Sequence, residues 1–270
     1  MHGAGNSFVL TENLHGELQG EDLSGLALRL CARSETDGMI VLIPASGDAD
    51  FGMLFYNSDG SLGEMCGNGA RCICRYAFET GLAGEVQIIE TDAGPVSGRR
   101  LDARNYRIRL NDPSVLDTER VVEAEGRALQ AAYAELGDPG IPHVVVPFAG
   151  LAQTDPERLR GLGERLRHHP AFPKGANVNF YEITGPDEVL LLTYERGVED
   201  FTYACGTGTG STAAVLTLKG LISGRGTRFK MRGGTLIMDV MRDEAGRITD
   251  LYLTGPTNIV AKGELTDEEL

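Results

Sequence analysis

The chain of 270 residues is long enough for one large domain or two moderate ones, and its 41% hydrophobic content is sufficient for a substantial core. A formal net charge of −14 argues against a nucleic-acid partner, because phosphate binding requires a basic surface. The N-terminus lacks the features of a signal peptide, and no apolar run is long enough for a membrane span, so we expect a cytoplasmic protein.

The first part of the chain is predicted to form strands around one amphipathic helix. A glycine-rich turn leads into an apolar strand at residues 8–10, and Leu23, Leu26 and Leu30 recur at helical spacing. Further strands are expected at residues 39–43, 51–56, 86–89 and 106–110.

The second part of the chain carries similar signals. Residues 119–136 combine helix-favouring alanines and glutamates with stretches of period two, so helix and strand both stay open there. Asp155 and Pro156 predict the start of a helix that ends near His168. Further strands are expected at residues 141–146, 176–181, 189–194, 228–231, 236–240 and 251–254.

The five cysteines are an odd number in a long chain, which is not typical of a disulfide framework, so we expect reduced thiols. Cys66, Cys72 and Cys74 lack the paired spacing of a zinc site, and no nearby histidine completes one. We therefore expect no bound metal, and we predict that Cys31, Cys72 and Cys74 are packing residues.

A repeated cysteine motif is the most informative feature of the sequence. The motif Cys66-Gly67-Asn68-Gly69 is repeated as Cys205-Gly206-Thr207-Gly208. Each copy is followed by a segment that ends with Gly-Leu, in which the glycine is Gly81 or Gly220. The cysteine-to-glycine spacing is the same in both copies, because 81 − 66 and 220 − 205 are both 15. Each copy therefore predicts a helix with its cysteine at the N-terminus and a glycine cap at the other end.

A cysteine at a helix N-terminus is expected to be reactive, because free N–H groups and the helix dipole stabilise a thiolate. Such an end also attracts carboxylates. Two thiols that face one another could remove a proton from one side of a carbon and return it on the other side. The repeat thus favours a two-base racemase or epimerase.

Polar residues near the two cysteines are candidates for substrate binding. Asn57 lies in a turn shortly before Cys66, and Asn177 alternates with apolar residues in a strand. Glu195 and Arg196 follow a strand shortly before Cys205, where they could bind the ammonium and carboxylate groups of an amino acid. A plain turn, a solvent-facing row and a surface ion pair remain the alternatives for these positions.

Several motifs in order along nearly the whole chain resemble the diaminopimelate epimerase family. They are Gly3-x-Gly5-Asn6 with Phe8-Val9, Asn57-x-Asp59-Gly60-Ser61, Met65-Cys66-Gly67-Asn68-Gly69-Ala70-Arg71-Cys72, Pro142-His143, Asn177-Val178-Asn179-Phe180, Glu195-Arg196-Gly197 and Ala204-Cys205-Gly206-Thr207-Gly208.

The resemblance implies an α/β (α+β) fold of two pseudo-symmetric domains, each a curved, barrel-like mixed sheet around a central helix, with the active site in the cleft between them. We place the N-terminal domain at residues 1–112 plus 256–270 and the C-terminal domain at 113–255, because Asn111-Asp112-Pro113-Ser114 and Gly255-Pro256 are the best candidate boundaries. The resemblance also implies a homodimer and independence from pyridoxal phosphate and metals.

By the same resemblance, Cys66 and Cys205 are the two catalytic bases, one thiolate and one thiol. Backbone N–H groups around Gly67-Asn68 and Gly206-Thr207 would hold the reacting carboxylate. The remaining ammonium and carboxylate groups of the substrate would be bound by Asn6, Asn57, Asn177, Glu195 and Arg196.

Three positions depart from the family pattern. Ser7 stands where an acidic residue usually follows the asparagine, Ile141 stands where many members carry an asparagine, and residues 199–203 form a longer segment than usual. These changes concern the distal end of the substrate and leave the proton-transfer residues unchanged.

The leading hypothesis is cofactor-independent epimerisation of LL-2,6-diaminopimelate to the meso isomer, in lysine and peptidoglycan precursor biosynthesis. The nearest alternative is a racemase or epimerase of the same fold that acts on another amino acid. A hydroxyproline-type dehydratase is disfavoured because that chemistry typically dispenses with one cysteine. A redox-responsive binding protein, in which Cys66 and Cys205 form a disulfide, is the alternative from another class.

Overall fold

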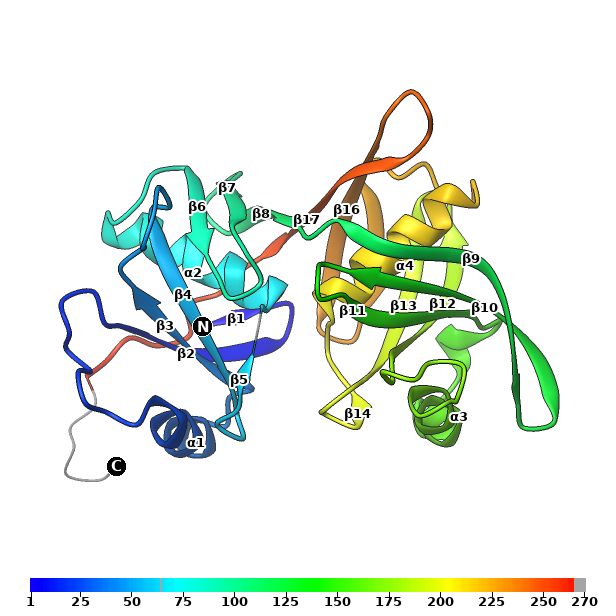
Figure 1. Cartoon of the computed structure of the whole chain (residues 1–270), viewed down its shortest axis with the longest axis horizontal. Coiled ribbons are helices and arrows are strands. Elements are labelled where there is room, and N and C mark those ends of the chain that lie inside the picture. The colour runs from blue at the N-terminus through cyan, green and yellow to red at the C-terminus, as the bar shows by residue number, and fades with distance from the viewer. Residues whose placement is uncertain (64, 265–270) are drawn as a thin grey trace. The chain divides into compact units, whose positions relative to one another are not determined.

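The computed structural model describes residues 1–63 and 65–264. The chain forms two compact units (Figure 1), the first made of Met1–Ile108 with the chain from Thr254 onward, and the second of Arg109–Leu253. These divisions fall a few residues before the boundaries that the sequence predicts. Residues 265–270 of the predicted returning segment lie outside the described residues.

The first unit alternates strands with two helices. Phe8 in β2 pairs in parallel with Gly38 in β3, β3 pairs antiparallel with β4, β4 is parallel to β6, and β6 and β7 are antiparallel. The elements are β1 (His2–Gly3), β2 (Asn6–Glu12), α1 (Leu23–Ser34), β3 (Gly38–Ile43), β4 (Phe51–Asn57), β5 (Leu62–Gly63), α2 (Gly67–Thr80), β6 (Val86–Glu90), β7 (Val96–Arg100) and β8 (Asn105–Leu110), which runs across the boundary.

The second unit repeats this order of pairing. β11 and β12 are parallel, β12 and β13 antiparallel, β13 and β15 parallel, and β15 and β16 antiparallel. Its elements are β9 (Pro113–Ala124), β10 (Arg127–Leu136), β11 (Ile141–Pro147), the 3-10 turn η1 (Leu151–Gln153), α3 (Glu157–Arg167), β12 (Asn177–Gly185), β13 (Glu188–Glu195), β14 (Asp200–Phe201), α4 (Gly206–Leu218), β15 (Thr227–Met231), β16 (Gly234–Arg242) and β17 (Ile248–Pro256), which also runs across the boundary.

The two units are therefore copies of one topology. In both, the first helix (α1 or α3) connects two parallel strands, and the cysteine helix (α2 or α4) connects the next parallel pair. A parallel pair needs such a crossover, because a tight turn can join only antiparallel strands. The predicted internal repeat and the mixed α/β fold are confirmed.

Each cysteine helix is the central element of its unit. α2 packs on β1, β2, β3 and β7, and α4 packs on β9, β10, β11, β12 and β16. α4 lies across its strands in Figure 1 and is buried on almost every side, which fits its run of small and aliphatic residues. The apolar contacts of these helices fix where each cysteine stands.

The two cysteine helices end on the same arrangement of backbone hydrogen bonds. α2 ends on Gly81, whose φ of 79° is in the left-handed region, as predicted. Lys219 after α4 still has ordinary helical angles, and Gly220, whose φ of 67° is also left-handed, follows it. Gly220 N–H bonds to the Thr217 carbonyl as Gly81 N–H bonds to that of Phe78, and Leu221 and Leu82 each bond back five residues in the same way, so the predicted glycine at the end of each helix is confirmed.

The region left open at residues 119–136 belongs to a β-hairpin. Glu125 and Gly126 have φ of 55° and 69°, which is typical of the two central residues of a type I′ turn. The period-two pattern therefore decided the structure over the helix-favouring composition. The predicted helix at 155–168 is present, but α3 begins at Glu157, a position later than expected, while Asp155 Oδ1 still accepts from the Glu157 N–H at 3.1 Å.

None of the described helices is long and apolar enough to cross a membrane.

β7 packs so closely on α2 that a side chain added at Gly98 is expected to destabilise the protein. A Cβ atom on Gly98 would lie 2.3 Å from Sγ of Cys74, which is fully buried. We expect Gly98→Ala to lower the free energy of unfolding of the protein by about 1–3 kcal/mol, because the added methyl overpacks the core. Urea denaturation measures the change.

Gly84→Ala is the matched control, since a Cβ atom there meets nothing within 4 Å. The Gly98→Ala penalty should shrink in a Cys74→Ala background, which removes the sulfur. An equal penalty in both backgrounds would contradict the packing account.

Candidate active site

Cys66 occupies the N-cap position of α2. Its φ and ψ of −128° and 113° are extended, and its Sγ accepts from the Gly69 N–H at 3.5 Å. The first intrahelical bond runs from Ala70 N–H to the Cys66 carbonyl at 2.8 Å. The N–H groups of Gly67 and Asn68 precede that bond, so they lie at the positive end of the helix beside the half-buried thiol.

Two of the predicted binding residues surround this thiol. Asn6 Oδ1 accepts from Cys66 Sγ at 3.6 Å and from Asn68 Nδ2 at 3.3 Å. Asn68 is 2% exposed, whereas Asn6 is only half-buried at the start of β2. The structure therefore brings Asn6, Cys66 and Asn68 together.

The supports behind these residues were not predicted. Asn6 Nδ2 donates to Asp37 Oδ2 at 2.9 Å, and Arg71 Nη2 donates to Asn68 Oδ1 at 2.9 Å. Burial lowers the pKa of the Arg71 guanidinium to about 10, which still leaves it a cation at neutral pH. The sequence does hold a signal for each support: Asp37 is a charged residue directly before the buried strand β3, and Arg71 is a charged residue among the glycines, alanine and cysteines that begin α2.

Asn57 lies at the end of β4, opposite Gly38 in the register. This places it at the same end of the sheet as Asn6, because β2 and β3 begin there and β4 ends there. Its Nδ2 donates to Ser61 Oγ at 2.9 Å within its own turn. A role of Asn57 in the site stays a prediction.

Cys205 repeats the geometry of Cys66 at the N-cap of α4. Its φ and ψ are −118° and 113°, its Sγ accepts from the Gly208 N–H at 3.4 Å, and Thr207 Oγ1 lies 3.6 Å from the sulfur. The thiol is 7% exposed. Gly206 and Thr207 supply the N–H groups that open this helix.

A second set of predicted residues gathers at the ends of β12 and β13 in the same unit. Asn177 Oδ1 accepts from the Arg196 N–H at 2.8 Å, and Asn177 Nδ2 donates to the Pro142 carbonyl at 3.3 Å. Glu195 is half-buried and its Oε2 accepts from Thr202 Oγ1 at 2.9 Å. The Arg196 side chain is exposed. Asn177 thus positions the Glu195-Arg196 turn.

A buried polar cluster supports the first turn of α4. Asn179 Oδ1 accepts from Thr193 Oγ1 at 2.9 Å, and Asn179 Nδ2 lies 3.2 Å from Nδ1 of His143. A Cβ atom on Gly208 would lie 2.4 Å from Asn179 Oδ1, so the glycine lets the helix end pack directly on β12.

The remaining cysteines are buried as predicted. Cys31, Cys72 and Cys74 are at most 2% exposed. Burial raises the pKa of the Cys72 thiol to about 12 and that of Cys74 further, so both are protonated and inert near neutral pH.

The departures from the family pattern have clear local structures. The N–H and Oγ of Ser7 both donate to Asp37 Oδ2, at 2.6 and 3.0 Å. Ile141 begins β11 and pairs with Leu136. The longer segment contains β14, in which Asp200 pairs with Glu195.

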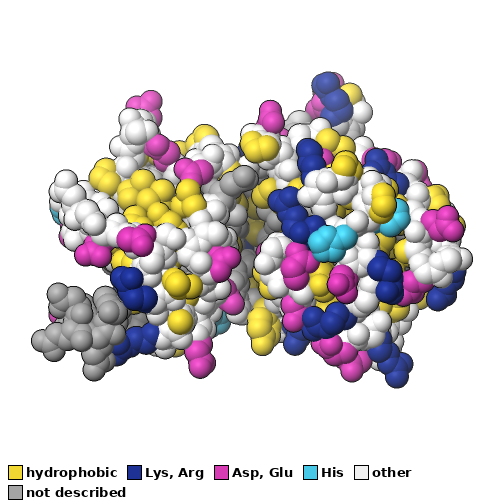
Figure 2. Space-filling model, turned by 60° about the horizontal axis from the view of Figure 1, so that its bottom comes forward, with side chains coloured by type: hydrophobic (Ala, Val, Ile, Leu, Met, Phe, Trp, Pro, Cys, Tyr) yellow, Lys and Arg dark blue, Asp and Glu magenta, His cyan; other side chains and the backbone are white. Residues whose placement is uncertain are grey.

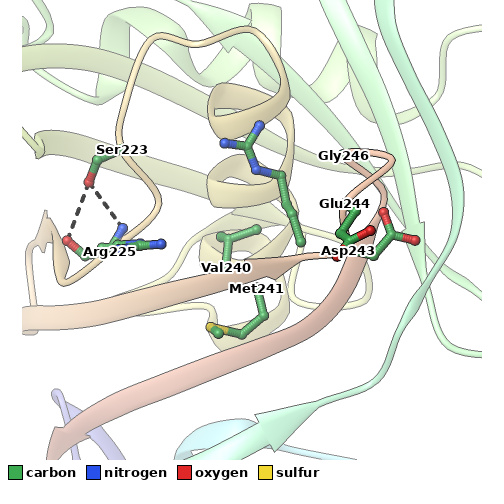
Figure 3. A pocket seen from close by; sticks show the side chains of 8 residues that line it. Ser223, Arg225, Val240, Met241, Asp243, Glu244 and Gly246 are labelled. Carbon is green, nitrogen blue, oxygen red and sulfur yellow. Dashed lines mark hydrogen bonds between the residues drawn. The ribbon is translucent and has the colours of Figure 1, made fainter.

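One hollow on the surface of the second unit is lined by residues outside the candidate site. Figure 3 shows this hollow of about 380 Å³, which is lined in part by Val240 and Met241 of β16 and where Ser223 Oγ bonds to the backbone of Arg225; none of the predicted site residues lines it. On the face shown in Figure 2, Lys and Arg side chains are interspersed with Asp and Glu. That distribution is unlike the basic stripe of a nucleic-acid-binding surface.

Solved structures share this fold. A probable proline racemase from Agrobacterium radiobacter K84 has a TM-score of 0.60 and 21% identity, covering 81% of this chain and 73% of its own. A predicted epimerase from Pseudomonas aeruginosa has a TM-score of 0.63 and 15% identity, covering 95% and 92%. The fold is thus one found among racemases and epimerases.

Relatives by sequence extend over the full length. A diaminopimelate epimerase from Aquifex aeolicus is 34% identical over 283 residues, covering 100% of this chain and 98% of the relative. One from Methanothrix thermoacetophila is 36% identical over 282 residues, covering 100% and 96%. The family described as diaminopimelate epimerase matches residues 1–105 and 137–260. The chain belongs to this family and is an isomerase of the epimerase type.

The buried His143 predicts how the free energy of unfolding depends on pH. Burial, aided by Arg196, lowers the pKa of its imidazole from 6.5 to about 3. Below pH 6.5 the unfolded chain binds a proton that the folded chain does not, so the free energy of unfolding falls as the pH falls. Between pH 6.5 and 5 we expect His143 to contribute a slope that approaches about 1.4 kcal/mol per pH unit.

Urea denaturation across that pH range measures the slope. His143→Gln should flatten it, whereas His15→Gln, at an exposed position, should leave it unchanged. Parallel curves for His143→Gln and the parent protein would show that His143 does not titrate in this way.

Proposed function

We propose that the chain converts LL-2,6-diaminopimelate to meso-diaminopimelate, with Cys66 and Cys205 as the two acid–base groups. The observation that carries this proposal is the matched geometry of the two thiols: each is an N-cap whose Sγ accepts from the N–H three residues later. The family of the chain and the names of its relatives supply the substrate.

In the proposed reaction one cysteine acts as a thiolate and takes the α-proton from the substrate. The electron pair left on the α-carbon is delocalised into the adjacent carboxylate. The other cysteine, as a thiol, gives its proton to the opposite face of the same carbon, and the configuration inverts. The reverse direction exchanges the two roles, so the two titrations are coupled.

The helix ends supply the groups that stabilise this charge. The N–H groups of Gly67 and Asn68 in α2, and of Gly206 and Thr207 in α4, would bind the reacting carboxylate and its developing negative charge. Preorganised donors of this kind lower the barrier because they need no reorientation during the reaction.

The remaining groups of the substrate need a second set of contacts. Arg196 carries an exposed guanidinium suited to a distal carboxylate, and Glu195 carries a carboxylate suited to an ammonium group. Asn6 and Asn57 would bind from the first unit. Asn177 would act through the Arg196 turn, since both ends of its amide are already hydrogen-bonded.

Two thiols supply both proton transfers, so the proposed mechanism needs neither pyridoxal phosphate nor a metal. The product would serve lysine and peptidoglycan precursor synthesis. We also propose a cytoplasmic homodimer.

The proposal is tested by incubating the reduced protein with LL-diaminopimelate and measuring the meso isomer by chiral chromatography. We expect Cys66→Ala and Cys205→Ala each to lower the rate by about 10²–10⁴-fold or more, because each removes one acid–base group. Cys31→Ala is the matched control, since that thiol is buried in α1 and should leave the rate unchanged.

Full activity of either active-site variant would overturn the two-thiol mechanism. Failure of the folded, reduced protein to convert LL-diaminopimelate, together with racemisation of another amino acid, would instead overturn the substrate.

A further inference from the structure

Four side chains form a continuous hydrogen-bonded row beside Cys66. Asp37 accepts from Asn6, Asn6 accepts from Asn68, and Asn68 accepts from Arg71. The two asparagine amides lie in the middle, with an anion at one end and a cation at the other. We refer to these four residues as the amide relay.

The Asp37 end fixes the orientation of Asn6. A carboxylate can only accept, so the amino group of the Asn6 amide must be the group that faces Asp37 Oδ2 at 2.9 Å. The same oxygen also accepts from the N–H and Oγ of Ser7, which holds the carboxylate in place. The Asn6 oxygen is thereby turned toward Cys66.

The Arg71 end fixes the orientation of Asn68 independently. A guanidinium can only donate, so the oxygen of the Asn68 amide must face Arg71 Nη2, and its amino group faces Asn6. Arg71 is fully buried and also donates to the Gly67 carbonyl at 3.3 Å. Gly3 leaves the space, because a Cβ atom there would lie 3.3 Å from Arg71 Nη2.

The orientation of Asn6 that Asp37 sets is compatible with the orientation of Asn68 that Arg71 sets. The donor of Asn68 faces the acceptor of Asn6 at 3.3 Å, so reversing either amide alone would oppose two like groups. The Asn6 oxygen that results from this arrangement accepts from Cys66 Sγ. A hydrogen bond from a thiol to an acceptor favours the protonated form of that thiol.

Cys205 has a different neighbour. Thr207 Oγ1 lies 3.6 Å from its sulfur, and a hydroxyl can either donate to a thiolate or accept from a thiol. The Thr207 contact at Cys205 is therefore compatible with both protonation states, whereas the Asn6 contact at Cys66 favours the protonated one.

We propose that Asp37 and Arg71 are positioning residues that fix the polarity of the Asn6–Asn68 amide pair, so that an oxygen and not an amino group faces Cys66 and helps to retain the proton on its sulfur. The effect of the Asn6 oxygen is opposite to that of the N–H groups at the start of α2 and of the Arg71 charge, which both favour the thiolate form of Cys66. The consequence for catalysis rests on the proposed function: the relay would keep Cys66 able to serve as the proton donor.

Other ionisable groups near Cys66 also influence its protonation, and they are the same in all the variants compared unless a variant replaces them. Arg71 interacts with it from α2, and Asp37 lies beyond Asn6. The described strands packed on α2 contribute His2 in β1, Glu12 in β2, and Arg99 and Arg100 in β7, and β3 contributes none.

The experiment measures the pH dependence of Cys66 alkylation by iodoacetamide, followed by mass spectrometry of the Cys66 peptide. The protein is the full chain carrying Cys205→Ala, alone and combined with Asp37→Asn, with Asn6→Ala, and with both. An asparagine at position 37 can donate or accept, so it frees the Asn6 amide to turn its amino group toward the thiolate. We expect Asp37→Asn to lower the midpoint of the alkylation profile by about one pH unit.

The double variant separates the relay from simple loss of charge. If Asp37 acts through the Asn6 amide, Asp37→Asn should produce no more change in the Asn6→Ala background than Asp50→Asn does. Asp50 is the matched control, because its Oδ2 also accepts a backbone N–H, that of Ile88 at 2.7 Å, and it lies outside the relay.

An equal shift on Asp37→Asn with and without Asn6, or a midpoint that stays or rises, would overturn the proposal. If Asp37→Asn does not fold, Asn6→Ala alone decides: a lower midpoint than the parent supports the relay, and an equal or higher one refutes it. Alkylation needs no substrate, so this result is independent of whether the protein epimerises diaminopimelate.

Discussion

The position of a sulfur atom at the N-terminus of a buried helix is the constraint on which the candidate site depends. In both units the thiol accepts from the N–H three residues along, and that residue is a glycine. A Cβ atom at Gly69 would lie 2.8 Å from Ile40 Cδ1, and one at Gly208 would lie 2.4 Å from Asn179 Oδ1. The glycines therefore allow each helix end to approach its sheet closely enough to hold the cysteine.

The repeat is not an exact copy, and the difference has a steric origin. Arg71 stands five positions after Cys66, and Gly210 stands five positions after Cys205, since 71 − 66 and 210 − 205 are both 5. A Cβ atom on Gly210 would lie 2.6 Å from Leu110 Cδ1, so no side chain fits there. The first thiol thus has a buried cation beside it, and the second has a hydroxyl. The two thiols that exchange the roles of acid and base in the proposed reaction therefore have different surroundings.

Much of the fold could be predicted from the sequence because its signals are local. The helices after Cys66 and Cys205, and the buried strands such as β3, follow from apolar periodicity, glycine caps and the repeat. The hairpin of β9 and β10 could not be decided, since alanines and glutamates favour helix while the strand pairing that stabilises it is not local. β7 was missed because only Val96 and Gly98 of its five residues are buried.

The candidate site, like the fold, could be predicted only in part from the sequence. The position of each cysteine at a helix N-terminus could be predicted, because the Cys-Gly-x-Gly motif and the glycine spacing are local signals. Asp37 could not be assigned, because its partner Asn6 lies 31 positions away and only the parallel pairing of β2 with β3 brings them together. Asn177 was predicted for its polarity on a core strand, but the sequence could not show that its amide is already bonded at both ends.

In the proposed reaction, two different thiols act on the two faces of one carbon. The most direct measurement is the initial distribution of deuterium when the reduced protein acts on LL-diaminopimelate in heavy water, resolved by mass spectrometry of the separated isomers. We expect each meso molecule to carry one deuterium while the remaining LL substrate stays unlabelled, because the second thiol delivers deuterium and the first thiol, when the reaction reverses, returns the hydrogen it took. Label that enters the LL substrate as fast as the meso product forms, or unlabelled meso product, would contradict it.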